Sequence, residues 1–498
     1  MGERYLAFDL GAESGRVVLG ELEERGRLRI VEIHRFANGM VNVRGHLHWD
    51  IPDLYHELVK GIRLCAETHT FSPASIGIDT WGVDFALLDE RGKLLELPFA
   101  YRDPWTQGAM EGFFKKLPRA RIYDITGIQI LPITTVFQLY AMTRERRPLL
   151  EAASDLLFIP DLFHYIFTGV KNSEFTLATT SQLYNPKTRE WDPEIFAHLG
   201  VSRNLMQDIV QPGTVLGETT ETLRGQTGLM RTPVVAVATH DTASAVAALP
   251  VSGEDFAYIS SGTWSLVGIE SPDPIITDKA FQYNLTNEGG VGKTFRVLKN
   301  ITGLWLLREC RKAWVDTQNG SYEELVIRAE GSPPFTAIMD PDRAEFLNPP
   351  DMPAAIQTFL KNTGQASPQD TGQMVRMILE GLALAYRQAL EQVAETSGRD
   401  LKQIHIIGGG SQNRLLCQLT ADATGLPVFA GPVEATAIGN ILVQAMASGM
   451  IQNLKELRKV VRESFAVTLY KPSPTADWDK AYNDFLKLKQ WNSDEKGG

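Results

Sequence analysis

A carboxylate follows an apolar run in the middle of the chain, in the segment Ala236-Val-Ala-Thr-His-Asp-Thr-Ala-Ser-Ala-Val246. The apolar residues predict a buried strand, and the alanine-rich residues that follow predict a helix. Open α/β sheets bind their ligands where strands end, so Asp241 is predicted to lie at a ligand crevice. There it could act as a general base that accepts a hydroxyl proton. The alternative is a helix cap, a position that favours Asp and Thr.

His240 precedes this carboxylate and could donate a hydrogen bond to a sugar oxygen, although a lone histidine is more often structural. Gly82, in Thr80-Trp-Gly82, would let a sugar approach the backbone beside an indole face. The alternative for Trp81 is ordinary core packing. Asn300 could bind a sugar hydroxyl, or it could be a turn residue.

A first candidate phosphate loop lies between two predicted strands, in Asp9-Leu-Gly-Ala-Glu-Ser-Gly-Arg16. Gly11 and Gly15 would allow unusual φ angles, so that successive N–H groups point at phosphate oxygens. Ser14 would add a hydroxyl donor and Arg16 a positive charge. Asp9 could hold a hydrated Mg²⁺. The alternative is a tight hairpin with a solvated Asp9; the loop lacks the Gly-Lys-Ser/Thr string of the P-loop.

A second small-residue turn, Ser260-Ser-Gly-Thr263, occupies the corresponding place in the second half of the chain. Two such hairpins predict a duplicated fold, with the two loops facing each other across a cleft. Gly408–Gly410 precede a predicted helix, where a flat ring could lie on the backbone and phosphate oxygens could meet the helix N-terminus. The alternative is a structural turn, and the spacing does not fit the Gly-x-Gly-x-x-Gly of dinucleotide folds.

Alternating and periodic patterns predict the elements that position these residues. Mixed, largely helical residues from about 105 to 230 interrupt the strands of the first half as an insertion. We therefore expect two α/β domains, 1–248 and 249–498. Single strands are predicted over 5–10, 17–22, 28–36, 233–238 and 403–407, and two strands each within 75–89 and 255–270. Helices are predicted over 52–70 and 415–423.

Composition excludes several classes of partner. The 498 residues include 49 basic and 60 acidic side chains, for a net charge of −11, and no basic stripe that would bind nucleic acid. The longest apolar run, near 234–251, is broken by His240 and Asp241, so no membrane span is expected. Three widely spaced cysteines and the lack of a signal peptide indicate a reduced, cytoplasmic protein with buried thiols. The sequence leaves the oligomeric state open.

Taken together, these segments resemble the FGGY carbohydrate kinases over residues 4 to 472. The motifs that carry the resemblance are DLGAESGR (9–16), IDTWGVDFALLD (78–89), AYRD (100–103), HDTASAV (240–246), SSGTWSLVG (260–268), NEGG (287–290), LKNITGLWLL (298–307), IIGGGSQN (406–413) and GPVEATAIGN (431–440). Two departures are Glu13, where the family commonly has Ser, and Arg308, where some members carry Gln near the nucleotide.

The resemblance implies a two-domain actin/hexokinase-type (ribonuclease H-like) fold with an active-site cleft between the domains. The implied reaction transfers the ATP γ-phosphoryl group to a ketose with Mg²⁺ as cofactor. The motifs favour L-rhamnulose, with L-fuculose, xylulose or glycerol as alternatives; an actin-like ATPase is a rival of another class. The implied roles are Asp241 as proton acceptor; Gly82, His240, Asp241, Thr242 and Asn300 at the sugar; Ala12, Glu13, Ser14, Gly15, Arg16, Thr263 and Gly409 at ATP; and Asp9 at Mg²⁺ through water.

Overall fold

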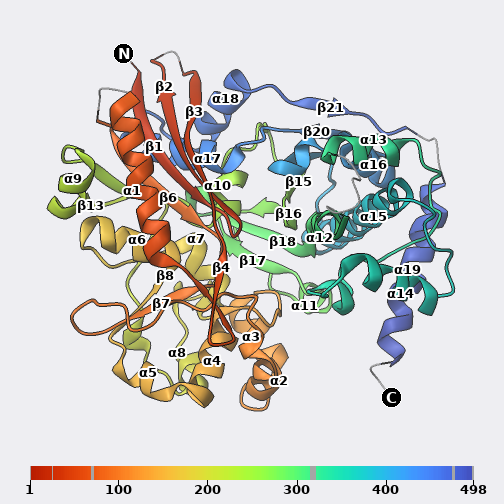
Figure 1. Cartoon of the computed structure of the whole chain (residues 1–498), viewed down its shortest axis with the longest axis horizontal. Coiled ribbons are helices and arrows are strands. Elements are labelled where there is room, and N and C mark those ends of the chain that lie inside the picture. Colours follow the sequence, from red (N-terminus) through yellow and green to blue (C-terminus); the bar gives the residue numbers. More distant parts are fainter. Residues whose placement is uncertain (1, 25, 69–71, 315–320, 474–476, 496–498) are drawn as a thin grey trace. The chain divides into compact units, whose positions relative to one another are not determined.

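The computed structural model describes residues 2–24, 26–68, 72–314, 321–473 and 477–495, and it divides into two compact units (Figure 1). The first unit consists of residues 1–252, 270–297 and 435–465. The second consists of residues 253–269, 298–434 and 466–498. Each unit is therefore discontinuous in sequence. Residues 69 and 70 of the predicted helix over 52–70 lie outside the described residues.

The first unit is built on a six-stranded mixed sheet in the order β13-β14-β6-β1-β2-β3. β1 pairs antiparallel with β2 and parallel with β6, and β6 pairs parallel with β14. The central strands β1 and β6 are apolar because both of their faces are covered, as is usual for parallel strands. The strands of this sheet are β1 (Glu3–Leu10), β2 (Ser14–Leu22), β3 (Leu28–Ala37), β6 (Ser75–Thr80), β13 (Thr214–Glu218) and β14 (Pro233–Ala236).

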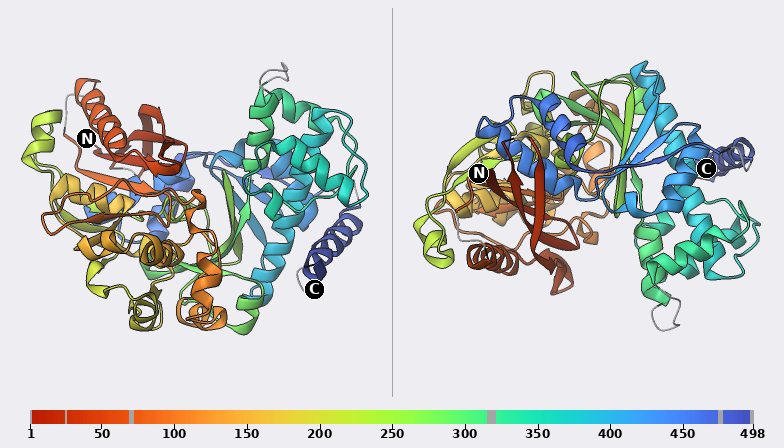
Figure 2. Two further views of the ribbon diagram at one scale, coloured as in Figure 1. Left: turned by 60° about the horizontal axis from the view of Figure 1, so that its bottom comes forward. Right: turned by 90° about the horizontal axis from the view of Figure 1, so that it is seen from above.

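Two helices from distant parts of the sequence cover opposite faces of this sheet. Gly61 of α1 (Ile51–Thr68) lies against Val17, and Gly20 lies against Ile441 of α17 (Ala435–Ala447). Positions 17 and 20 of β2 point to opposite faces because side chains alternate along a strand. The red strands and the blue α17 consequently lie side by side in Figure 1, and α1 follows the strands in Figure 2.

The region from about 105 to 230 is mixed and largely helical, as predicted, and a hydrophobic cluster that includes Phe113, Phe137, Leu156 and Phe196 packs it. The predicted end of the insertion is wrong, because β13 lies within this range and pairs with β14 in the large sheet. The remaining helices of the first unit are α2 (Ala109–Phe114), α3 (Arg119–Thr126), α4 (Thr135–Glu145), α5 (Arg147–Ala152), α6 (Ile159–Thr168), α7 (Phe175–Ala178), α8 (Pro193–Leu199), α9 (Glu221–Thr227), α10 (Asp241–Ala247), α11 (Asp278–Gln282) and α18 (Leu454–Ser464). Its short strands outside the large sheets are β4 (Met40–Val43), β5 (His46–Trp49), β7 (Phe85–Leu88), β8 (Asp155–Phe158), β9 (Ser173–Glu174), β10 (Tyr184–Asn185), β11 (Glu190–Trp191) and β12 (Ile209–Val210).

The second large sheet repeats the strand arrangement of the first, which confirms the predicted duplication. β15 pairs antiparallel with β16 and parallel with β19, as β1 pairs with β2 and β6, and β19 pairs parallel with β20. In sheet order its strands are β17 (Thr286–Gly289), β18 (Phe295–Thr302), β16 (Trp264–Ser271), β15 (Phe256–Ser261), β19 (Gln403–Ile407), β20 (Val428–Ala430) and β21 (Thr468–Tyr470). The chain passes between the units within β16 and β18.

The helices of the second unit are α12 (Trp305–Trp314), α13 (Tyr322–Glu330), α14 (Met352–Asn362), α15 (Thr371–Ser397), α16 (Arg414–Thr424) and α19 (Trp478–Glu495). Across the described ranges of the chain, no helix combines the length and apolar character that crossing a membrane requires. Cys65, Cys310 and Cys417 are free and buried, as predicted. Burial raises the pKa of the Cys65 thiol to about 11 and that of Cys417 to about 12.

Candidate active site

Asp241 lies at the predicted junction between a strand and a helix, but it is not the helix cap. The N-cap of α10 is His240, and Asp241 is the first helical residue. Its Oδ1 accepts hydrogen bonds from the Thr242 backbone N–H (2.5 Å) and hydroxyl (3.2 Å). About a third of the side chain, 32%, is exposed. The cap interpretation is therefore wrong, and Asp241 keeps a solvent-facing carboxylate at the end of the sheet.

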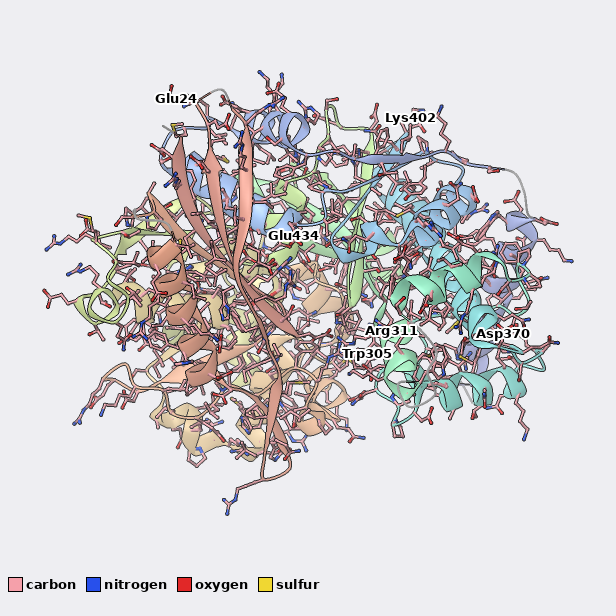
Figure 3. The ribbon with its side chains drawn as sticks, turned by 45° about the horizontal axis from the view of Figure 1, so that its top comes forward. Glu24, Trp305, Arg311, Asp370, Lys402 and Glu434 are labelled. Carbon is pink, nitrogen blue, oxygen red and sulfur yellow. The ribbon has the colours of Figure 1, made fainter. Side chains whose placement is uncertain are left out.

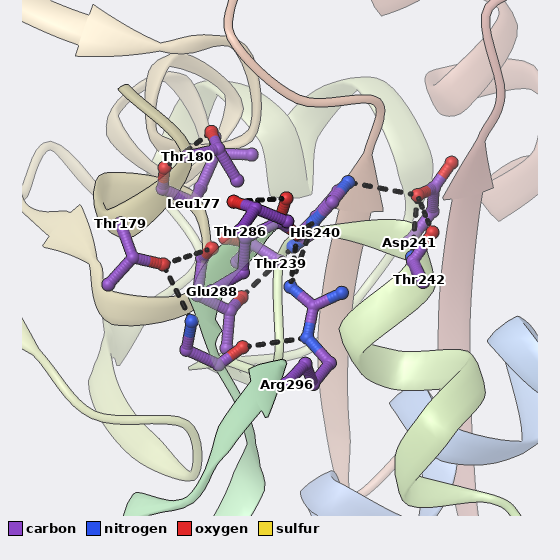
Figure 4. Close-up of polar contacts among 12 residues, drawn as sticks. Leu177, Thr179, Thr180, Thr239, His240, Asp241, Thr242, Thr286, Glu288 and Arg296 are labelled. Atoms are coloured by element: carbon purple, nitrogen blue, oxygen red, sulfur yellow. Dashed lines mark hydrogen bonds and ion pairs between the residues drawn. The ribbon is translucent and has the colours of Figure 1, made fainter. Parts of the chain in front are cut away.

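The His240 imidazole is enclosed by a buried ion pair (Figure 4). Arg296 on β18 is fully buried, and its Nη2 lies 3.0 Å from His240 Nδ1 and 3.1 Å from Glu288 Oε2. Its Nε donates to the Gly289 carbonyl oxygen at 2.9 Å. Burial raises the pKa of the Glu288 carboxyl, but the Arg296 charge and the contacts with His240 and Thr286 together hold this pKa below its ordinary value. The other ring nitrogen, Nε2, lies 3.5 Å from Asp241 Oδ1.

The backbone before His240 is anchored by a second buried carboxylate, Glu174. It accepts hydrogen bonds from the backbone N–H and the hydroxyl of Thr239, and from both of these groups on Thr176. The Thr176 hydroxyl in turn accepts the His240 N–H at 3.1 Å. Burial raises the pKa of Glu174 to about 7. The position of His240 is thus set by two separate polar networks of the first unit.

Gly82 lies directly beside the His240 ring. A Cβ added at Gly82 would lie 3.4 Å from His240 Nε2, so a larger residue would crowd this nitrogen. The neighbouring Trp81 is buried: its ring packs on Trp49 at a centroid distance of 4.0 Å, and its Nε1 donates to Asp84 at 3.0 Å. The core-packing alternative is therefore confirmed for Trp81.

Asp9 and Asp79 are adjacent residues of paired parallel strands, and both are buried. Asp9 forms an ion pair with Arg16, and Asn440 of α17 donates to Asp79 Oδ2 at 2.6 Å. Burial raises the pKa of both carboxyls; the charge of Asp241 adds to this at each, whereas Arg16 opposes it. Three carboxylates of the first unit thus lie close enough to affect one another's ionisation.

The first loop is a hydrogen-bonded turn, although not through the predicted glycine conformations. Neither Gly11 nor Gly15 has a positive φ, so that part of the prediction is wrong. The turn closes through Gly11 N–H to the Ser14 carbonyl at 3.0 Å, and Asn38 donates to the Gly11 carbonyl at 2.7 Å. Gly15 is required for packing, because a Cβ there would lie 2.2 Å from the Phe36 ring. Residues 11–13 form the turn between β1 and β2, whereas Ser14, Gly15 and Arg16 are the first residues of β2.

In the second unit, the glycine-rich turn packs against the second loop. Gly408 has a φ of +79°, and a Cβ on Gly410 would lie 2.0 Å from Ser261 Oγ. Gly409, between them, has open space where a side chain would stand. Thr263 lies in the turn between β15 and β16, and its carbonyl accepts the Gly303 N–H at 3.1 Å. Both predicted nucleotide residues of this unit therefore lie on turns at strand ends.

Basic and aromatic side chains gather on α12 of the second unit, where Trp305 and Arg311 are labelled in Figure 3. Arg308 lies over the Trp305 ring at 4.7 Å, and Arg311 lies over Tyr322 at 5.5 Å. Burial lowers the pKa of Arg308 below its ordinary value. Arg308 thus has a stacking role of its own in this structure. Asn300 lies further upstream, on β18.

The structure brings together Asp9, Gly82, His240, Asp241 and Thr242 at one end of the first sheet, as strand order requires. Sequence reasoning missed the buried partners Glu174, Arg296, Asp79 and Asn440. A signal existed for Arg296, since a charged residue interrupts the apolar run Phe295-Arg-Val-Leu298. No such signal marks Asn440, because its contact with Asp79 spans 361 positions.

Comparison with known proteins assigns the chain to a family. The profile of the N-terminal domain of the FGGY family of carbohydrate kinases matches residues 4–248, and that of the C-terminal domain matches residues 257–448. The chain belongs to the FGGY carbohydrate kinases. FGGY relatives include "Rhamnulokinase" of Bacteroides thetaiotaomicron, 47% identical over 97% of this chain and 99% of the relative. "Rhamnulokinase" of Enterococcus faecalis is 42% identical over 97% of each chain.

Solved structures of other kinases share the fold. Gluconate kinase from Lactobacillus acidophilus superposes with a TM-score of 0.81 at 16% identity, covering 98% of each chain. Glycerol kinase from Plasmodium falciparum, solved with ADP, gives 0.76 at 14% identity, covering 99% of this chain and 98% of that chain. The two-domain α/β fold expected from the resemblance to the FGGY kinases is confirmed at this level.

Proposed function

We propose that this FGGY kinase transfers the γ-phosphoryl group of ATP to the 1-hydroxyl of L-rhamnulose. The observation that carries the proposal is its agreement with proteins named rhamnulokinase, which are 42–47% identical over 93–99% of the chain. The His240-Asp241-Thr242 segment supports it, because an accessible carboxylate there stands beside two hydrogen-bond donors at a strand end.

Asp241 acts in this proposal as the general base. Its partly exposed carboxylate would accept the hydroxyl proton as the oxygen attacks phosphorus. Gly82, His240 and Thr242 would hold the ketose on the first unit, and Asn300 is assigned to it by the family motif. Most of the rate enhancement would come from positioning and from stabilising phosphate charge.

ATP phosphates would be bound by backbone N–H groups of Ala12, Glu13, Ser14, Gly15 and Arg16, with Thr263 and Gly409 assigned from the family motifs. The carboxylates near Asp9 fit a hydrated Mg²⁺. Asp79 Oδ1 is a buried oxygen without a hydrogen bond among the described residues, and burial and then the neighbouring carboxylates raise the pKa of this side chain. When bound, Mg²⁺ would neutralise charge on the phosphates.

A coupled ADP-release assay over L-rhamnulose, L-fuculose, D-xylulose and glycerol tests the substrate. Buried donors and acceptors left unpaired by the wrong epimer should make kcat/KM for L-rhamnulose higher by about 10-fold or more. Equal efficiency on glycerol or D-xylulose would leave only the broader sugar-kinase assignment. ATP-dependent sedimentation without any sugar-dependent ADP release would instead favour the actin-like ATPase.

The three buried thiols accord with a reducing, cytoplasmic location.

A further inference from the structure

Arg296 makes a contact that restricts the chemistry of His240. The guanidinium Nη2 lies 3.0 Å from His240 Nδ1, and the arginine is fully buried (Figure 4). A guanidinium has five N–H donors and no acceptor. At this distance, Nδ1 must therefore accept with its lone pair, since a proton on Nδ1 would face the N–H of Arg296. The ring proton is then on Nε2, and the imidazole is neutral.

Glu288 is the competing partner for Nδ1. Its Oε2 lies 3.4 Å from Nδ1, farther away than Arg296 Nη2 at 3.0 Å. Arg296 also lies 3.1 Å from Glu288, so its charge and that of the carboxylate oppose each other next to the ring. The pair therefore delivers a directed hydrogen bond to His240 with little net charge.

The opposite ring nitrogen faces the place where the sugar is proposed to bind. Nε2 lies 3.5 Å from Asp241 Oδ1, and a Cβ on Gly82 would lie 3.4 Å from it. An N–H there can donate to a sugar oxygen held beside Asp241.

We propose that Arg296 is a positioning residue that fixes His240 as the neutral tautomer protonated on Nε2, which then donates a hydrogen bond to the ketose beside Asp241. This inference rests on the proposed function for the identity of the ketose. The tautomer is expected in the sugar-free enzyme as well, so it can be measured without a ketose. Three charged groups face the His240 ring: Asp241 from α10, Glu288 from β17 and Arg296 from β18.

The experiment is ¹⁵N NMR of the full-length enzyme labelled at histidine, with the His240 ring signals assigned by their loss in His240→Gln. In the unsubstituted enzyme, Nδ1 should show the shift of an unprotonated nitrogen and Nε2 that of a protonated one. In Arg296→Met, Nδ1 should become protonated and donate a hydrogen bond to the Glu288 carboxylate. The ring should then be the other tautomer or an imidazolium. In Glu288→Gln, the Arg296 contact remains and the original tautomer should persist.

Kinetics of the same variants give the second readout. Arg296→Met should lower kcat/KM for the ketose by about 10- to 100-fold, because His240 no longer holds the tautomer that donates to the sugar. Arg296→Lys should recover part of the loss, and KM for ATP should stay within about twofold. Arg458→Met breaks a similarly buried ion pair, to Glu270, at the far end of α10 and should leave the His240 signals unchanged.

A proton on Nδ1 in the unsubstituted enzyme, or identical His240 signals with and without Arg296, would overturn the inference. If Arg296→Met does not fold, the spectra of the unsubstituted enzyme and of Glu288→Gln still decide the tautomer. An enzyme with the expected tautomer that phosphorylates no ketose would instead refute the proposed function.

Discussion

Gly439 of α17 lies directly against the backbone of Ser244 in α10. A Cβ built on Gly439 would stand 1.8 Å from the Ser244 carbonyl oxygen, far inside contact distance. The next residue, Asn440, donates to Asp79, and α10 itself begins at Asp241. The glycine of the GPVEATAIGN motif therefore permits the helix contact that holds α10 in place.

Gly439→Ala should force α10 and α17 apart. Overpacking of this kind costs about 1–3 kcal/mol, so we expect a lower free energy of unfolding in urea and a lower kcat, because Asp241 moves with α10. Gly225→Ala is the matched control: Gly225 is a helical glycine of α9 with open space around it. It should stabilise the protein by about 0.5–1 kcal/mol. Equal effects of the two substitutions would contradict the role given to Gly439.

Asp241→Asn should lower kcat by about 10²- to 10⁴-fold, because the amide cannot accept the hydroxyl proton. ATP affinity, measured by calorimetry, should change little. Asp278→Asn removes an exposed carboxylate from the first turn of another helix, α11, and should leave kcat unchanged. Near-normal turnover by Asp241→Asn would exclude it as the base.

Gly11→Val tests the first phosphate loop. A Cβ on Gly11 would already lie 3.2 Å from the Ser14 carbonyl, and the two added methyl groups would stand where phosphate oxygens are proposed to bind. We expect ATP affinity to fall by about 10-fold or more, which corresponds to a loss of about 1.4 kcal/mol or more of binding free energy. The circular dichroism spectrum should be unchanged. Gly39→Val, in the open neighbouring turn, is the control; unchanged affinity in Gly11→Val would rule the loop out.

Asp84 predicts a pH dependence of stability. Burial raises its pKa from 3.8 to about 7, although Gln138, Trp49, Trp81 and the Tyr101 N–H all donate to it. Between these two values the unfolded chain has lost the proton that the folded protein retains. Raising the pH through this window should therefore lower the free energy of unfolding, by at most about 1.4 kcal/mol per pH unit from this group.

Urea unfolding at a series of pH values from 4 to 8 measures this slope. Asp84→Asn should make it shallower and leave the share that comes from Glu174, whose pKa is also raised to about 7, even if the substitution lowers stability at every pH by placing an amide against the two tryptophan donors. Asp53→Asn, which alters an exposed carboxylate on α1, should keep the original slope. A slope that is the same with and without Asp84 would show that its carboxyl is ionised in the folded protein.

The sequence by itself determined the local elements and the chemistry they carry. Apolar runs and small-residue turns predicted β1 and β2, their counterparts β15 and β16, and the strand end that bears Asp241. These features depend on neighbours in the chain, namely side-chain periodicity and turn preference, so they can be predicted from local order.

Only the tertiary structure decided which distant residues complete the site. The packing of sheets and helices places α17 against α10, Asn440 against Asp79, and Arg296 against His240. The sequence could not predict these contacts, because contacts between remote segments leave no periodic pattern in it. The same packing explains why Gly15 is needed for the Phe36 ring rather than for an unusual φ, and why Trp81 belongs to the core. A residue type limits what chemistry is possible, whereas burial and partners, set by the whole fold, decide which chemistry it performs.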